Sequence, residues 1–169
     1  MKNLTLITGG VRSGKSSYAI KKAEFYNSPL YIATGWADDN EMAIRIQKHK
    51  EERCSKWTTI EEKFEIWKSI EKSEKLTVDF ILVDCITMWI SNLMLNNRNI
   101  EDSVKHLINA LTEVKLPVML VTNEVGLGIV PTTETGRLYR DLLGWTNQKL
   151  AAKCDNLIFM ISGIPMRIK

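Results

Sequence analysis

Residues Gly9–Ser16 have the types and the spacing needed to hold a polyphosphate. They read Gly-Gly-Val-Arg-Ser-Gly-Lys-Ser, which matches G-x-x-x-x-G-K-[ST] at every fixed position. Glycines let backbone N–H groups wrap closely around phosphates, and the helix that follows points its positive end at them. In this motif the lysine reaches the β- and γ-phosphates and the final hydroxyl binds Mg²⁺. The predicted nucleotide site therefore comprises Gly9, Gly10, Val11, Arg12, Ser13, Gly14, Lys15 and Ser16, with Ser16 also a metal ligand.

A carboxylate at Asp84 could complete this site. It directly follows the apolar run Phe80–Val83, and in P-loop proteins an Asp at such a strand end holds the Mg²⁺ shell. Asp is also a favoured N-cap, here for a helical segment starting near Met88, so a purely structural role stays open. The position after a strand, taken together with the P-loop, favours the metal role.

A second candidate for chemistry is His49, on a helix predicted over residues 38–54. Glu41, Arg45, His49 and Arg53 recur every four residues, so they lie on one side of that helix. Two nearby arginines favour the neutral imidazole, which is a nucleophile, and they could also hold phosphate oxygens. The same side carries apolar residues, however, and the residue types alone favour a half-buried structural histidine.

The elements that must position these residues alternate between strands and helices. The strands are continuous apolar runs, which is typical of a parallel sheet covered on both faces. We therefore expect an α/β, RecA-like P-loop NTPase-like fold with a mostly parallel sheet and helices on both faces. The predicted strands are Leu4–Thr8, Pro29–Ala33, Phe80–Val83, Pro117–Thr122 and Asn156–Ile161, with Met166–Lys169 as a candidate edge strand. The predicted helices are Ser13–Phe25, 38–54, Phe64–Glu71, Met88–Leu95, Glu101–Val114 and Gly136–Ala152.

Length and composition are those of an ordinary globular protein. The 169 residues suit one domain over residues 1–169, and a net charge of +3 fits an anionic ligand but does not call for nucleic acid. Cys54, Cys85 and Cys154 match no zinc spacing, and their odd number without a signal peptide favours a reducing cytoplasm. No apolar run approaches membrane-spanning length, so we expect no membrane partner. His106, on a helix of ordinary polar residues, is expected to be structural or at the surface.

Several stretches in order along nearly the whole chain resemble one known family, the bifunctional adenosylcobinamide kinase/adenosylcobinamide-phosphate guanylyltransferases. The P-loop alone is generic, whereas the Arg-Ile-x-x-His-x-x-x-Arg pattern of Arg45–Arg53 and the stretch Asn123–Pro131 are specific. The matching stretches are Gly9–Ser16, Tyr31–Thr34, Glu41–His49, Arg53, Trp57, Glu61, Val83–Thr87, Asn92, Asn123–Pro131, Arg137–Asp141, Asn147, Gln148 and Ser162–Pro165.

The resemblance implies two reactions late in adenosylcobalamin synthesis. ATP or GTP phosphorylates the aminopropanol hydroxyl of adenosylcobinamide, and GMP from GTP is then attached to that phosphate. The second reaction of the family passes through a guanylylated histidine, which matches His49 here, with Arg45 and Arg53 as candidates for stabilising the α-phosphate. The same resemblance adds Thr34, Glu61 and Asp84 to the nucleotide site, with Mg²⁺ held by Ser16 and Asp84. It also implies a homotrimer.

Two positions depart from the family pattern. Lys48 stands where some relatives carry another histidine, and Trp145 replaces a residue that is usually basic. Two other functions remain open from the residues themselves: a different small-molecule P-loop kinase, and a nucleotide-binding module without catalysis. A guanylyltransferase that has lost its kinase half is disfavoured by the intact P-loop.

Overall fold

The computed structural model describes residues 3–35 and 56–169, which build a seven-stranded sheet. The strand order is β3-β2-β4-β5-β1-β6-β7, and every neighbouring pair is parallel except β6 with β7. The strands are β1 (Leu4–Gly9), β2 (Pro29–Ala33), β3 (Thr58–Glu61), β4 (Phe80–Asp84), β5 (Val118–Val121), β6 (Asn156–Ile161) and β7 (Ile164–Arg167).

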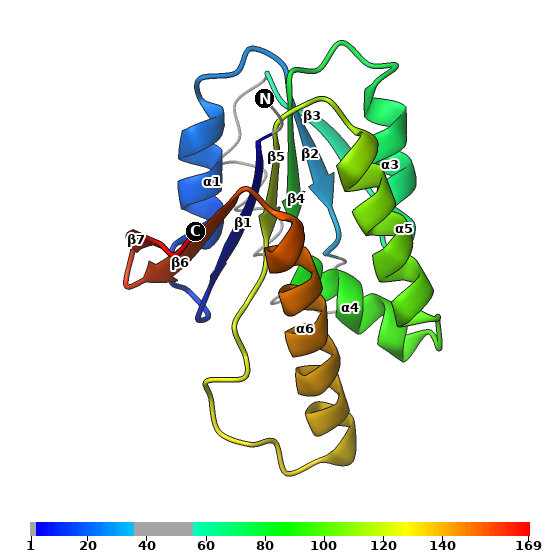
Figure 1. Cartoon of the computed structure of the whole chain (residues 1–169), viewed down its shortest axis with the longest axis vertical. Coiled ribbons are helices and arrows are strands. Elements are labelled where there is room, and N and C mark those ends of the chain that lie inside the picture. The colour runs from blue at the N-terminus through cyan, green and yellow to red at the C-terminus, as the bar shows by residue number, and fades with distance from the viewer. Residues whose placement is uncertain (1–2, 36–55) are drawn as a thin grey trace.

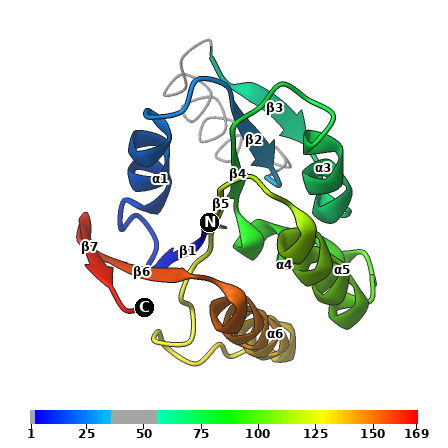
Figure 2. The ribbon, with the colours of Figure 1, turned by 45° about the horizontal axis from the view of Figure 1, so that its top comes forward.

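Helices cover both faces of this sheet, as Figures 1 and 2 show. In the described part of the chain, α1 packs on one face, and α3, α4, α5 and α6 pack on the other. The fold predicted from the alternating pattern is therefore confirmed. The helices are α1 (Lys15–Ala23), α3 (Ile66–Ser73), α4 (Ile86–Leu95), α5 (Ile100–Glu113) and α6 (Glu134–Lys153). The helix predicted over residues 38–54 lies outside the described residues.

The apolar strands are buried because each face of the sheet has its own core. Along β1, Leu6 packs toward the four-helix face, whereas its neighbour Ile7 packs toward α1, since successive strand side chains alternate. The larger core is filled by Trp89 and Leu107, among other side chains, and the smaller one by Phe80. A strand buried on both faces reads as a continuous apolar run, which explains why the pattern predicted the inner strands.

The sequence predicts the two edge strands of the sheet only weakly or not at all. The strand β3 was not predicted because its sequence Thr-Thr-Ile-Glu is short and mostly exposed. The candidate edge strand at the C-terminus is confirmed as β7, although it starts earlier, at Ile164. It pairs antiparallel with β6 through Ser162 and Gly163, whose φ angles of 50° and 85° suit the tight hairpin turn.

The parallel strands bring three chain segments together at the carboxyl ends of the strands. β1, β4 and β5 all end there, at the lower side of the sheet in Figure 1. The P-loop follows β1, the start of α4 follows β4, and a loop over residues 122–133 follows β5. Within the described ranges, no helix is both long and apolar enough to cross a bilayer.

Candidate nucleotide site

The P-loop is shaped by glycines at both of its ends. Gly9 has φ 142°, and a Cβ built there would lie 2.4 Å from the carbonyl oxygen of Met160 on β6. Gly14, just before α1, has φ 89°, a backbone conformation that residues other than glycine rarely adopt. Arg12 also has a left-handed φ, of 56°. The loop therefore turns sharply between β1 and α1, as a backbone cradle for phosphates requires.

Lys15 is folded back over this loop. It is the first residue of α1 and is 8% exposed, and its Nζ donates to the carbonyl oxygen of Gly10 and, at 3.4 Å, to the Ser13 hydroxyl. Burial lowers the pKa of the Lys15 ammonium below the usual value for lysine, and Cys85 and Asp84 offset part of this effect. The ammonium is thus held by neutral acceptors, which phosphate oxygens could replace with stronger, charged ones.

Asp84 lies at the end of β4 with its carboxylate in the site. Its Oδ2 accepts a hydrogen bond of 3.0 Å from the hydroxyl of Tyr31 on β2. The helix α4 begins at Ile86, and its N-cap is Cys85, whose Sγ accepts from the N–H of Met88 at 3.5 Å. The alternative interpretation of Asp84 as an N-cap is therefore wrong, because its neighbour has that role.

The oxygen groups present here fit Mg²⁺ bound together with a nucleotide. Ser16 stands in the first turn of α1 and Asp84 at the end of β4, so a hydroxyl and a carboxylate come from the two elements that flank the site. Mg²⁺ prefers such oxygen ligands, keeps several waters and is usually held through one or two protein groups plus phosphates. In residues 3–35 and 56–169, no group of three or more His, Cys, Asp or Glu side chains could hold a metal alone. The hydroxyl and the carboxylate by themselves suit a metal ion that arrives with the triphosphate.

Two further predicted nucleotide residues lie at neighbouring strand ends. Thr34, just after β2, is fully buried, and its hydroxyl donates to the carbonyl oxygen of Cys85 at 2.7 Å and accepts from the Cys85 N–H at 2.8 Å. Glu61 ends β3, is exposed, and pairs in register with Ala33. The Thr34 hydroxyl thus joins the ends of β2 and β4, and contacts of either residue with a nucleotide stay predictions.

A polar network behind the site was not predicted from the sequence. Thr87 in the first turn of α4 accepts the N–H of Asn123 at its hydroxyl, at 2.7 Å, and the hydroxyl of Tyr139 at its carbonyl oxygen, at 3.0 Å. On α6, the Asn147 side chain donates to the Asn123 carbonyl oxygen at 3.1 Å and accepts from the Thr122 hydroxyl at 2.8 Å. The network fixes the start of the 122–133 loop against α4 and α6. In the sequence, the pair of polar residues Thr122 and Asn123 directly after an apolar strand was the signal that could have indicated this network.

Burial also affects two ionisable groups, Tyr139 in this network and Cys85 next to it. It raises the pKa of the Cys85 thiol to about 12, with a further contribution from Asp84. Burial likewise raises the pKa of the Tyr139 phenol, with a smaller contribution from Cys85. Both groups are therefore neutral at physiological pH, and Tyr139 serves as a hydrogen-bond donor.

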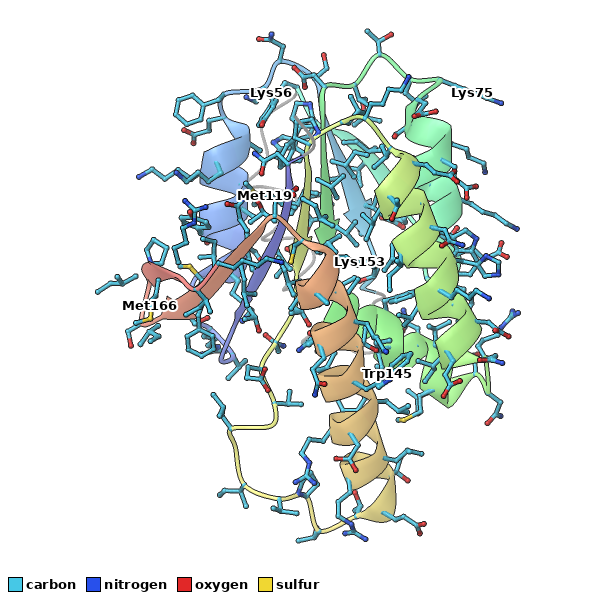
Figure 3. The ribbon with its side chains drawn as sticks, in the orientation of Figure 1. Lys56, Lys75, Met119, Trp145, Lys153 and Met166 are labelled. Atoms are coloured by element: carbon cyan, nitrogen blue, oxygen red, sulfur yellow. The ribbon has the colours of Figure 1, made fainter. Side chains whose placement is uncertain are left out.

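The remaining candidates divide into those that the structure places and those that it does not. His49, Arg45 and Arg53 lie outside the described residues. His106 is at the surface of α5, stacked on Trp67 of α3 with ring centroids 5.2 Å apart, so its predicted structural or surface role is confirmed. Trp145 is half-buried against the larger core, and Figure 3 shows it on the side of α6 that is turned toward α4.

The strand β1, which leads into the P-loop, and the strand β4, which ends at Asp84, lie on either side of β5. This fold and site define a P-loop NTPase-like nucleotide-binding protein. Solved structures that share the fold include two from archaea. The flagellar accessory protein FlaH from Methanocaldococcus jannaschii has a TM-score of 0.57 at 16% identity, over 99% of this chain and 78% of its own. A KaiC-like protein from Pyrococcus horikoshii has a TM-score of 0.53 at 17% identity, over 93% and 70%.

Sequence comparison identifies the family within this class. A family profile described as cobinamide kinase / cobinamide phosphate guanyltransferase matches residues 5–168, so the chain belongs to that family and is a transferase of adenosylcobalamin biosynthesis. The bifunctional adenosylcobalamin biosynthesis protein CobP of Pseudomonas aeruginosa is 39% identical, covering 97% of this chain and 96% of the relative. The protein CobU of Salmonella typhimurium, which bears the same description, is 39% identical over 98% and 99%. The resemblance found from the sequence motifs is confirmed.

Proposed function

We propose that one domain, residues 1–169, performs two successive transfers at the aminopropanol arm of adenosylcobinamide. In the first, the arm's hydroxyl attacks the γ-phosphate of ATP or GTP, giving adenosylcobinamide phosphate and a nucleoside diphosphate. In the second, the new phosphate receives GMP from GTP, giving adenosyl-GDP-cobinamide and pyrophosphate. The observation that carries this proposal is the family match over residues 5–168, which includes an intact P-loop.

The kinase step needs positioning and charge neutralisation more than covalent help from the protein. The P-loop N–H groups and the Lys15 ammonium are assigned to the β- and γ-phosphates, and the neutral acceptors of Lys15, which phosphate oxygens can replace, support this assignment. Ser16 and Asp84 are assigned to Mg²⁺, which would supply charge neutralisation when it is bound with the triphosphate. Each well-placed donor contributes about 3 kcal/mol at the transition state.

The guanylyl step is assigned to His49 through the family pattern. An imidazole nitrogen of His49 attacks the α-phosphorus of GTP, a phosphorus–nitrogen bond forms, and the bond to the departing pyrophosphate breaks. An oxygen of adenosylcobinamide phosphate then attacks the same phosphorus, and the phosphorus–nitrogen bond breaks to free the histidine. Arg45 and Arg53, one helical turn away on either side in the predicted helix, are assigned to the α-phosphate charge.

The setting of the enzyme follows from the same resemblance. We infer a homotrimer that works in the cytoplasm, where the substrates are small molecules: ATP, GTP, adenosylcobinamide and its phosphate. The odd number of cysteines, whose spacing matches no metal pattern, supports a reducing compartment.

The test is direct product analysis. The full chain is incubated with Mg²⁺, GTP and adenosylcobinamide, and the corrinoids are identified by mass. We expect adenosylcobinamide phosphate at short times and adenosyl-GDP-cobinamide with pyrophosphate later. Phosphorylation of a different alcohol with no corrinoid product, or nucleotide binding without turnover, would contradict the proposal.

A further inference from the structure

The hydroxyl of Tyr31 hydrogen-bonds the carboxylate of Asp84 on the face of the sheet that α1 covers. Tyr31 is 4% exposed, and its hydroxyl donates to Asp84 Oδ2 at 3.0 Å. A buried phenol needs a hydrogen-bond partner, and an ionised carboxylate can only accept, so the direction of this bond is set by chemistry. Among the described residues, Tyr31 is the one that hydrogen-bonds the Asp84 side chain, and Oδ1 is left for other ligands.

The strand register explains why these two residues meet. β2 and β4 are adjacent and parallel, with Tyr31 opposite Leu82 and Ala33 opposite Asp84. Tyr31 and Asp84 therefore project from the same face, two register positions apart, because side chains alternate along each strand. Only a long side chain with a polar end spans that offset, and tyrosine is such a residue.

An aromatic cluster holds the ring that carries this hydroxyl. Trp57 makes an edge contact with Tyr31 at a centroid distance of 5.9 Å, and Trp57 and Phe80 make another at 6.4 Å. Tyr26 stacks on Phe80 with ring centroids 4.5 Å apart. Packing of this kind restricts the ring, so the position of the Tyr31 hydroxyl is defined before any ligand binds.

We propose that Tyr31 is a positioning residue that fixes the orientation of the Asp84 carboxylate for binding a divalent cation with the nucleotide. This inference rests on the metal role of Asp84 in the proposed function. The torsion that orients an aspartate carboxylate is broad, so an unsupported group samples many orientations. A hydrogen bond that fixes Oδ2 also fixes the direction in which Oδ1 points. The loss of such supporting hydrogen bonds typically weakens metal binding by about 10- to 100-fold.

The test compares Tyr31→Phe with Tyr26→Phe in the full-length protein. Both variants lose one phenolic oxygen from the same aromatic cluster, but only the first loses the bond to Asp84. Affinity for Mn²⁺ in the presence of the ATP analogue AMP-PNP is measured by electron paramagnetic resonance, and affinity for AMP-PNP alone is measured in EDTA. We expect Tyr31→Phe to bind Mn²⁺ about tenfold more weakly. Its metal-free nucleotide affinity and all values for Tyr26→Phe should match the wild type.

A double-mutant cycle with Asp84→Asn separates this inference from the proposed function. If Tyr31 acts through Asp84, Tyr31→Phe has no further effect on Mn²⁺ affinity in the Asp84→Asn background. Wild-type Mn²⁺ affinity in Tyr31→Phe, with a loss in Asp84→Asn, overturns the positioning role alone. Wild-type affinity in both single variants overturns the metal role of Asp84 as well. A lower melting temperature with unchanged Mn²⁺ affinity assigns Tyr31 a purely structural role and also overturns the inference.

Discussion

Before any ligand binds, the buried charge of Lys15 destabilises the folded protein. Its ammonium is largely removed from water and, among the described residues, hydrogen-bonds only the neutral acceptors Gly10 and Ser13, while Asp84 and Cys85 act on it at longer range. Desolvation of this kind disfavours the charged form and lowers the pKa. The arrangement suits a residue whose intended partner is a polyphosphate, because binding that anion compensates for the cost.

Replacement of Lys15 by methionine should therefore separate stability from activity. The folded-state pKa of Lys15 is lowered, so its charge penalises folding below that pKa, and the penalty disappears as the pH rises toward 10.5. In urea unfolding at pH 7 we expect Lys15→Met to be more stable than the wild type, with a difference that shrinks at alkaline pH. Phosphorylation of adenosylcobinamide should fall at least about 100-fold. A variant less stable than wild type at pH 7 contradicts this account of the ammonium.

Cys85 is expected to be inert toward alkylation in the folded protein. Its thiol has a pKa of about 12, chiefly because burial disfavours the thiolate, and the thiolate is the reactive form. Peptide mapping after brief treatment with iodoacetamide at neutral pH should find Cys85 unmodified in the native protein and modified in urea. Cys154, whose pKa burial also raises, should behave in the same way. Labelling of native Cys85 at the rate seen in urea refutes the prediction.

At the scale of elements, glycines serve two different purposes. Gly9 links β1 to the P-loop with φ 142° and lies against the backbone of β6, whereas Gly144 lies within α6 and no atom of the described residues lies within 4 Å of a built Cβ. The first position needs glycine for both conformation and space. The second has no such need, and glycine there only weakens the helix.

The same added methyl group should thus have opposite effects at these two sites. Gly9→Ala should lower the free energy of unfolding by about 2–5 kcal/mol, from backbone strain and collision with the Met160 carbonyl. Gly144→Ala should raise it by about 0.5–1 kcal/mol. Urea denaturation of both variants beside the wild type measures the two changes. A destabilised Gly144→Ala would mean that α6 packs against a surface at this position.

The network that holds the 122–133 loop belongs to the same scale. Thr87→Val keeps the shape of the side chain but leaves the Asn123 N–H without its acceptor, at an expected cost of about 1–3 kcal/mol. Thr112→Val is the matched control, because that exposed hydroxyl donates to the carbonyl oxygen of Ile108 within α5, and a change within about 0.5 kcal/mol is expected. Thermal denaturation compares them, and equal melting temperatures would show that the network contributes nothing.

At the scale of the whole molecule, two transfers are assigned to one chain, and a single substitution should separate them. His49→Ala should abolish acid-labile labelling of the protein by GTP that carries a radioactive α-phosphate, because the nucleophile is gone. Phosphorylation of adenosylcobinamide should remain largely intact. His106→Ala, which removes a surface ring stacked on Trp67, is the control and should retain both activities. Equal loss of both activities in His49→Ala argues against the covalent role.

Some parts of the molecule could be predicted from the sequence in detail and others only in part. The inner strands and the P-loop were predicted because apolar runs and a contiguous motif depend on neighbouring residues. The edge strand Thr58–Glu61 was missed because it has no apolar run, and helix starts such as Ile86 were displaced by one or two residues. Asp84 was identified correctly as a strand-end carboxylate, but its alternative role as a cap could be rejected only once Cys85 was seen in that position.

By itself, the sequence determined that a phosphate-binding loop joins a buried strand to a helix and that the chain belongs to a cobinamide-modifying family, since both follow from contiguous residues. Only the tertiary structure decided that β5 lies between β1 and β4, and that Tyr31 reaches a carboxylate 53 residues away. Such contacts depend on strand order and register, which arise from packing of the whole chain rather than from any local pattern.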